Sequence, residues 1–286
     1  MQALADREPG VMFWAGRDPL VTLREVKGLG VRCGQLGVPG SLELDAGATA
    51  AWRSALEAER FTLVTVFAAY TGENYADIPT VERTVGFIPA DTRAEREART
   101  YAISDFAAAL GVGSIACHIG FVPEDHAHPD YIGVRDLVRR ISDHAARHNQ
   151  TFALETGQEP AEVLLRFFRD VNRPNLGINF DSANMILYGT GDPIDALGVL
   201  GPHVISVHCK DGDWPPAGVA GALGTERPLG QGSVGMERFL AKLKAIGFRG
   251  PLNIEREAEN HDERLRDMRM AVGLLERLRG ASGAGT

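Results

Sequence analysis

The sequence predicts one α/β domain folded as a single (β/α)8 TIM barrel. Eight short apolar runs alternate with eight helical segments, and this alternation is typical of a parallel sheet with crossover helices. Eight such units in 286 residues match the usual size of a (β/α)8 barrel. Because no linker-like stretch divides the chain, residues 1–286 are expected to form one domain. A doubly wound open sheet is the alternative arrangement of the same units.

The predicted strands are runs rich in branched apolar residues, and each is followed by turn-forming residues. Their length is that of strands rather than of ordinary helices. They comprise residues 11–14, 31–35, 63–67, 114–118, 151–155, 176–181, 204–209 and 252–255.

The predicted helices lie between these strands and carry apolar residues on one face. Gly28 is a stop signal for the first helix, and Asp192 followed by Pro193 is a start signal for the sixth. The tail 280–286 is small and polar and is expected to be frayed. The predicted helices span 18–28, 48–59, 93–110, 131–148, 160–171, a segment beginning at 192, 237–246 and 259–278.

Three strand-to-helix connections are long, namely 70–92, 119–130 and 211–235. In a barrel they lie at the C-terminal face, where active sites are built. The third contains seven glycines and three prolines, which predicts a shaped or mobile lid. Its stretch from Gly230 to Gly235 matches GxGxxG but follows a loop rather than a strand, so no nucleotide cofactor is expected. A phosphate bound by these backbone amides is left open.

The composition is that of an ordinary globular protein, with 44% hydrophobic and 24% charged residues. A net charge of −8 argues against nucleic-acid and anionic-membrane partners, which need a basic face. No apolar stretch approaches the roughly 18 residues of a membrane span, and the first ten residues lack the regions of a signal peptide. Cys33, Cys117 and Cys209 match no paired spacing and are expected to be buried free thiols. We therefore expect a cytoplasmic protein.

Four chemically active side chains end four successive apolar runs: Glu155, Asp181, His208 and Glu255. A charged residue at the end of a buried strand is costly unless it is paired or binds a metal. In a barrel these strand ends converge on one face, which favours a barrel over an open sheet and predicts one shared site. Three carboxylates and one imidazole suit a divalent metal ion.

Each of these residues also has a simpler explanation. Glu155 and Asp181 could be helix caps, His208 could be a structural histidine, and Glu255 could pair with the neighbouring Arg256. The occurrence of all four at successive strand ends favours the metal site. Arg256 is retained as a candidate substrate contact.

Further candidate substrate contacts lie at the same barrel face. His118 ends the fourth strand and could also be a fifth ligand or a core histidine. Lys210 shares strand parity with His208, so it could contact a substrate oxygen or be solvated. Trp14 ends the first strand and could provide an apolar wall or pack in the core. The remaining histidines are expected to be solvated; they are His126, His128, His144, His148, His203 and His261.

Two carboxylates beside one metal suit proton abstraction next to a carbonyl, with the metal stabilising an enediolate. Return of the proton to the opposite face gives epimerisation, and return to the neighbouring carbon gives aldose–ketose isomerisation. Loss of a β-leaving group gives dehydration or another lyase reaction. The residues alone do not choose among the three.

The second half of the chain resembles the sugar phosphate isomerase/epimerase family, also described as xylose isomerase-like TIM barrels. The first half fits this resemblance less specifically. The resembling segments, in chain order, are Leu-Glu-Thr-Gly (154–157), Asn-Phe-Asp-Ser-Ala-Asn (179–184), Val-His-Cys-Lys-Asp (207–211), Leu-Gly-Gln-Gly (229–232) and Asn-Ile-Glu (253–255).

The resemblance implies that Glu155, Asp181, His208 and Glu255 bind one divalent ion. Mn²⁺ is the expected ion, and Mg²⁺, Co²⁺ and Zn²⁺ are the alternatives. By analogy with the ketose 3-epimerases of the family, Glu155 and Glu255 are the acid–base pair. The expected partner is a small sugar or sugar-derived substrate, and family barrels often pair, so a homo-oligomer is left open.

Two positions depart from the ketose 3-epimerase pattern. Asn184 stands where those enzymes usually have a histidine, and Trp214 stands where they have an arginine. Both positions contact the ketose in those enzymes, so Asn184 is a candidate substrate contact and the substrate is expected to differ from a free ketose. The endonuclease IV branch needs further histidines, one of them at the position of Asn184, and a DNA-repair role is not expected.

Three functions follow from this reasoning. The first is a metal-dependent sugar or oxo-sugar isomerase or epimerase. The second is a metal-dependent lyase or dehydratase on an oxo-cyclitol or 3-oxo-glycoside, resembling inosose dehydratases or C-glycoside deglycosidases. The third is a non-catalytic barrel subunit, which predicts no tight metal binding.

Overall fold

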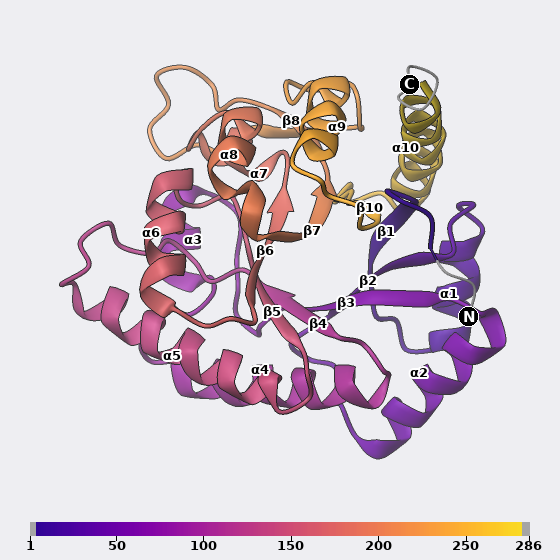
Figure 1. Ribbon diagram of the computed structural model, residues 1–286, viewed down its shortest axis with the longest axis horizontal. Helices are drawn as coiled ribbons and strands as arrows, with labels where there is room; N and C mark the ends of the chain where they lie inside the picture. The colour runs from indigo at the N-terminus through magenta and orange to yellow at the C-terminus, as the bar shows by residue number, and fades with distance from the viewer. Residues whose placement is uncertain (1–3, 282–286) are drawn as a thin grey trace.

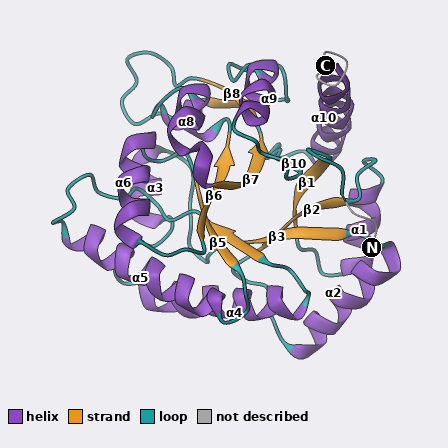
Figure 2. Ribbon diagram, viewed as in Figure 1, coloured by secondary structure: helices purple, strands orange, loops and turns teal. Residues whose placement is uncertain are grey.

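The computed structural model describes residues 4–281. Its centre is a closed barrel of parallel strands in the order β1-β10-β7-β6-β5-β4-β3-β2, and helices surround it (Figures 1 and 2). This closure confirms the predicted (β/α)8 barrel and excludes the open sheet.

The eight barrel strands correspond to the eight predicted ones, but β2 begins and ends later than predicted. The reason is that Gln35 lies inside the strand, where its side chain is buried and hydrogen-bonded. The barrel strands are β1 (Pro9–Trp14), β2 (Cys33–Val38), β3 (Thr62–Ala68), β4 (Ser114–Cys117), β5 (Thr151–Glu155), β6 (Leu176–Asp181), β7 (Val204–Cys209) and β10 (Leu252–Ile254).

The predicted start signal at Asp192 is confirmed, because its carboxylate accepts a hydrogen bond from the backbone N–H group of Ile194. Asp18 caps α1 in the same way, accepting from the N–H groups of Leu20 and Val21. Among the described residues, no helix combines the length and apolar character needed to cross a membrane. The outer helices are α1 (Pro19–Lys27), α2 (Ala46–Glu59), α4 (Arg93–Ala109), α5 (Pro129–Ala146), α6 (Ala161–Val171), α8 (Pro193–Leu200), α9 (Met236–Ala245) and α10 (His261–Ala281).

The predicted frayed tail is partly wrong, because Gly280 and Ala281 continue α10. The rest of that tail, 282–286, lies outside the described residues.

Short elements occupy two of the long connections at the C-terminal face. The first contains α3 (Ile78–Thr84), and the glycine-rich third contains an antiparallel hairpin of β8 (Asp211–Asp213) and β9 (Thr225–Arg227). The predicted lid is therefore a shaped loop with a hairpin at its base. The other short elements are α7 (Asn184–Tyr188) and the 3₁₀ turn η1 (Gly201–His203).

The largest apolar core lies between the strands and the outer helices, and a second small cluster fills the barrel axis. All three cysteines are free and buried, as predicted, and burial raises the pKa of the Cys33 thiol to about 12. The axial cluster consists of Met12, Phe67, Ala116 and Ala153.

The side chains that point into the barrel continue along each strand as far as the candidate site. Side chains two positions apart on a strand point to the same face, so each inward residue places its second neighbour at the barrel mouth. The pairs that end in a predicted ligand are Ala153 and Glu155, Asn179 and Asp181, Ser206 and His208, and Asn253 and Glu255.

Candidate active site

The four predicted ligands meet at the C-terminal end of the barrel. One ligand atom from each of Glu155, Asp181, His208 and Glu255 lies within 4.8 Å of the others. Register brings them together, because Asp181 is paired with His208 across β6 and β7. We call these four residues the carboxylate–imidazole cluster.

His208 is the centre of this cluster. Its Nδ1 lies 2.8 Å from Glu155 Oε1 and 3.2 Å from Glu255 Oε2, while its Nε2 lies 3.0 Å from Gln35 Oε1. The Gln35 amide nitrogen donates to Asn179 Oδ1, which leaves the Gln35 oxygen to accept. His208 Nε2 therefore carries a hydrogen, and Nδ1 faces the carboxylates, where it needs either a proton or a metal ion.

Sequence reasoning missed Gln35, although the signal that located the other residues was present. It is a polar side chain inside a buried apolar strand, and such a group requires a buried partner. The predicted strand ended at this residue, so its inward direction was not considered.

The two oxygens of Asp181 have different surroundings. Its Oδ1 accepts hydrogen bonds from the backbone N–H groups of Ala183 (2.7 Å) and Asn184 (2.8 Å), which fixes the turn that leads into α7. Its Oδ2 is buried and has no hydrogen-bond partner among the described residues. Glu155 Oε2 is also buried without a hydrogen bond, and the His118 imidazole lies 3.2 Å from it. Buried carboxylate oxygens without hydrogen bonds are costly, and a bound cation would reduce that cost.

The charge around the cluster points the same way. Lys210 Nζ lies 3.3 Å from Glu255 Oε2 and 2.8 Å from Glu257 Oε2. Burial lowers the pKa of Lys210, but these carboxylates raise it well above its usual value, so the lysine is charged. When the three carboxylates of the cluster are ionised, Lys210 offsets only part of their charge because it is shared with Glu257, and a divalent ion would offset more of it. Without an ion, burial raises the pKa of Asp181 well above its usual range.

These residues therefore fit a divalent metal ion. The donor set is three carboxylate oxygens and one imidazole nitrogen, and it is almost entirely shielded from solvent.

A cavity of about 220 Å³ lies above the cluster, and Glu255 lines it. Four predicted substrate contacts line it as well: Trp14, His118, Asn184 and Lys210. Sequence reasoning did not find several other residues of the lining, because they come from loops whose course depends on tertiary contacts. Those with polar groups are Glu73, Tyr75, Tyr188, Glu226 and Glu257.

His118 lies beside the cluster rather than in it. Its Nε2 is 3.2 Å from Glu155 Oε2, and its Nδ1 accepts a hydrogen bond of 3.1 Å from the Gln158 amide. Its ring packs against Phe67 and Tyr75 with centroid distances of 5.8 and 5.7 Å. The imidazole is thus fixed between Glu155 and the cavity.

Arg256 lies outside the lining of this cavity. Its guanidinium contacts Glu226 Oε2 and Asp267 Oδ2, each at 3.0 Å, and Glu226 also accepts a hydrogen bond from the Glu257 backbone. This placement ties the β8–β9 hairpin to α10 and gives no direct support to the predicted substrate contact.

The glycine-rich loop already binds an anionic group of the chain itself. The Asp211 carboxylate accepts hydrogen bonds from the backbone N–H groups of Gly212 and Gly230 at 2.9 Å and of Val234 at 3.1 Å. A Cβ at Gly232 would lie 2.4 Å from Asp211 Oδ1, so the glycine permits this close approach. These three amides are satisfied internally, which argues against the phosphate site that the sequence left open.

A third of the chain matches one curated protein. An uncharacterised protein of Methanocaldococcus jannaschii is 30% identical over 95 residues, which are 33% of this chain and 30% of that protein. So small a share of both chains carries no conclusion about function.

Three solved structures at 16% identity share the fold. A 3-keto-D-glucoside 4-epimerase from E. coli matches over 93% of this chain and 99% of its own, with a TM-score of 0.68. A xylose isomerase-like TIM barrel protein from Mycobacterium smegmatis, in complex with magnesium, matches over 95% and 96% with a TM-score of 0.69. The probable 3-DHS dehydratase of Bacillus anthracis matches over 93% and 98% with a TM-score of 0.64.

A much nearer relative is a xylose isomerase domain protein from Planctomyces limnophilus. It is 44% identical to this chain, covers 96% of this chain and 98% of its own, and superposes with a TM-score of 0.91. The sequence model of the xylose isomerase-like TIM barrel family matches residues 23–278. With the closed barrel and the cluster of strand-end ligands, this match establishes that the chain belongs to the xylose isomerase-like TIM barrel family.

Proposed function

We propose that the protein is a divalent-metal-dependent isomerase or epimerase of a sugar or oxo-sugar. The observation that carries this proposal is the carboxylate–imidazole cluster, with two buried carboxylate oxygens that lack hydrogen bonds, directly beneath a cavity lined by both polar and apolar side chains. The fold shared with a 3-keto-glucoside epimerase supports it.

Glu155, Asp181, His208 and Glu255 would hold the ion, and Gln35 would keep the His208 ring in the required tautomer. When bound, a divalent ion polarises carbonyl and hydroxyl oxygens of a sugar and acidifies the adjacent C–H group. Mn²⁺ is the proposed ion. The predominance of oxygen donors also suits Mg²⁺, while the imidazole admits Co²⁺ or Zn²⁺.

The two glutamates would move the proton. Glu155 comes from β5, and Glu255 follows β10, so they reach His208 from different strands. One would remove the proton and the other would return it. Each has its own neighbour with a donor group, because His118 lies beside Glu155 and Lys210 beside Glu255. Both neighbours line the cavity, where they can also contact substrate oxygens.

A lyase or dehydratase is the second candidate, and one acid in the cavity lining, Glu73, favours it. Burial raises the pKa of Glu73 above the usual value. A carboxylic acid that retains its proton can protonate a leaving group after proton abstraction. The fold shared with a probable 3-DHS dehydratase is compatible with this reaction.

Mass spectrometry after incubation in D₂O with Mn²⁺ tests these proposals. The substrates would be ketoses, their phosphates, inososes and 3-oxo-glucosides. A product of the same composition that carries one deuterium supports the isomerase or epimerase. A product lighter by water or an aglycone supports the lyase. Failure of every substrate to exchange in protein shown to contain metal contradicts both and favours a non-catalytic barrel.

A further inference from the structure

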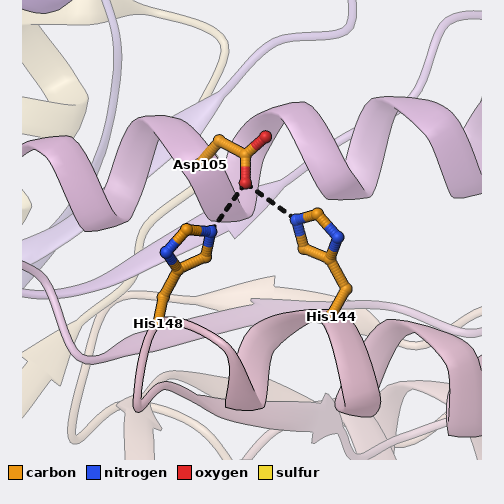
Figure 3. Close-up of side chains that lie close together, drawn as sticks. All are labelled: Asp105, His144 and His148. Carbon is orange, nitrogen blue, oxygen red and sulfur yellow. Dashed lines mark hydrogen bonds and ion pairs between the residues drawn. The ribbon is translucent and has the colours of Figure 1, made fainter.

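A second cluster of possible metal ligands lies on the outside of the barrel. Asp105 from α4 faces His144 from α5 and His148 just beyond α5 (Figure 3). These residues lie near the C-terminal ends of their helices, which lead into β4 and β5. The cluster is therefore at the end of the barrel where strands begin, opposite the candidate active site.

The donor atoms of this cluster converge. His144 Nε2 and His148 Nε2 each lie 2.8 Å from the same atom, Asp105 Oδ1. The two rings meet at 64° with their centroids 5.7 Å apart, so both present the same nitrogen to one point. In a tetrahedral zinc site the donors would be about 3.3 Å apart. Opening the present contacts by about half an ångström needs only a small rotation of the exposed Asp105 side chain.

The backbone explains why the two imidazoles face the same side. The last turn of α5 continues past Ala146 through hydrogen bonds from Arg147 N–H to His144 O and from His148 N–H to Ala145 O, each 3.0 Å. His144 and His148 are four positions apart, a spacing that places side chains one above the other on a helical turn. The same spacing of two histidines on a helix is used to bind zinc.

One of the imidazoles is also fixed by packing. The His144 ring stacks on Tyr101 with a centroid distance of 4.4 Å and an interplanar angle of 19°. The Tyr101 hydroxyl donates to Glu97, which is paired with Arg140 on α5. Orientation of a histidine by such neighbours raises metal affinity, because less freedom is lost on binding.

From this geometry we infer that Asp105, His144 and His148 form a binding site for Zn²⁺ or a similar transition-metal ion, which joins α4 to α5. Two nitrogen donors and one oxygen donor suit such an ion, and water completes the tetrahedron. The site is open to solvent, since the Asp105 side chain is 57% exposed and that of His148 is 35% exposed. The ion would stabilise the fold and would take no part in turnover at the opposite barrel end.

Zinc uptake by the untagged full-length protein in excess Mg²⁺ tests the inference. The zinc content of the wild type is compared with that of the His144→Gln/His148→Gln variant. Zinc bound at the carboxylate–imidazole cluster is present in both proteins and does not contribute to the difference. We expect the wild type to bind one more equivalent of Zn²⁺. We also expect Zn²⁺ to raise the Tm of the wild type by several degrees more than it raises the Tm of the variant.

The matched control is His126→Gln, which removes an exposed histidine elsewhere and should leave zinc binding unchanged. His148→Gln alone changes the more exposed imidazole and serves if the double variant fails to fold. Equal zinc content in the wild type and a folded variant, or a zinc-induced Tm shift of the same size in both, would overturn the inference. Because the variants leave the cluster at the barrel mouth intact, the result does not depend on the proposed function.

Discussion

His208 Nε2 donates a hydrogen bond of 3.0 Å to Gln35 Oε1 across the barrel, from β7 to β2. In the strand order, β1 and β10 stand between these two strands, so the bond spans the interior of the barrel rather than a strand pair. It fixes the tautomer and the direction of the ring that presents Nδ1 to three carboxylates. A metal-binding histidine is generally oriented by a partner of this kind.

Replacing Gln35 with leucine should weaken binding of Mn²⁺ by about 10- to 100-fold, because His208 loses the acceptor that orients it. Isothermal titration of the folded variant with Mn²⁺ measures this loss. Gln158→Leu is the matched control, since it removes a buried amide that contacts His118 rather than His208. Wild-type affinity in the Gln35 variant would show that the hydrogen bond does not position the ligand.

Replacing Glu155 or Glu255 with glutamine should lower turnover about 100- to 10,000-fold, because an amide cannot accept and return a proton. Deuterium incorporation from D₂O should fall in parallel. Glu259→Gln, which changes an exposed acid close to the same strand end, should retain wild-type turnover. Substantial turnover in both single variants would refute the acid–base assignment.

Asp181→Asn should separate the two roles of Asp181. The side-chain oxygen of asparagine can accept the same backbone hydrogen bonds from Ala183 and Asn184, so the turn before α7 should persist, while the metal site loses one ionised ligand. In the wild type, Mn²⁺ at a hundredfold excess over its Kd should raise the free energy of unfolding by about 2.7 kcal/mol, and chelation should remove this gain. The variant should fold and show a much smaller gain in urea unfolding. A gain equal to that of the wild type would exclude Asp181 as a ligand.

Glu159 should make the protein less stable as the pH rises. Burial raises its pKa to about 8, and its Oε2 has no hydrogen-bond partner in the described part of the chain. Between the unfolded pKa near 4.5 and this value the folded state binds the extra proton, so the free energy of unfolding falls with rising pH. The limiting slope is about 1.4 kcal/mol per pH unit.

Glu159→Gln keeps an oxygen for the Val122 N–H and should remove this dependence. Urea unfolding at several pH values between 5 and 8 measures it. The stability of the variant should increase relative to the wild type with each step in pH. Parallel pH profiles for the two proteins would mean that Glu159 is not protonated in the folded state.

The positions of the strands and of the four central residues could be predicted, because each is encoded locally. An apolar run marks a buried strand, and a charged residue at its end marks the site. The alternation of side chains along a strand also explains why two residues that were both predicted as substrate contacts, Lys210 and Arg256, lie in different places. Lys210 lies two positions after His208 and faces the cavity, whereas Arg256 directly follows Glu255 and binds carboxylates outside it.

Contacts between distant segments could not be predicted in this way. His144 and His148 were expected to be solvated, but both contact Asp105, some 40 positions earlier in the chain. Their spacing indicates a shared helix face and gives no information about which acid lies opposite. The same limit applies to Glu226, which reaches the cavity only because the hairpin folds back over the barrel mouth.

The Asp211 carboxylate holds the base of the loop above the cavity. It fastens the glycine-rich return segment, while the preceding residue, Lys210, reaches the cavity. Residues 214–224 lie between the hairpin strands, and Leu223 and Gly224 of this segment line the cavity. Substitutions there would change the cavity wall, while the residues at the strand ends stay in place.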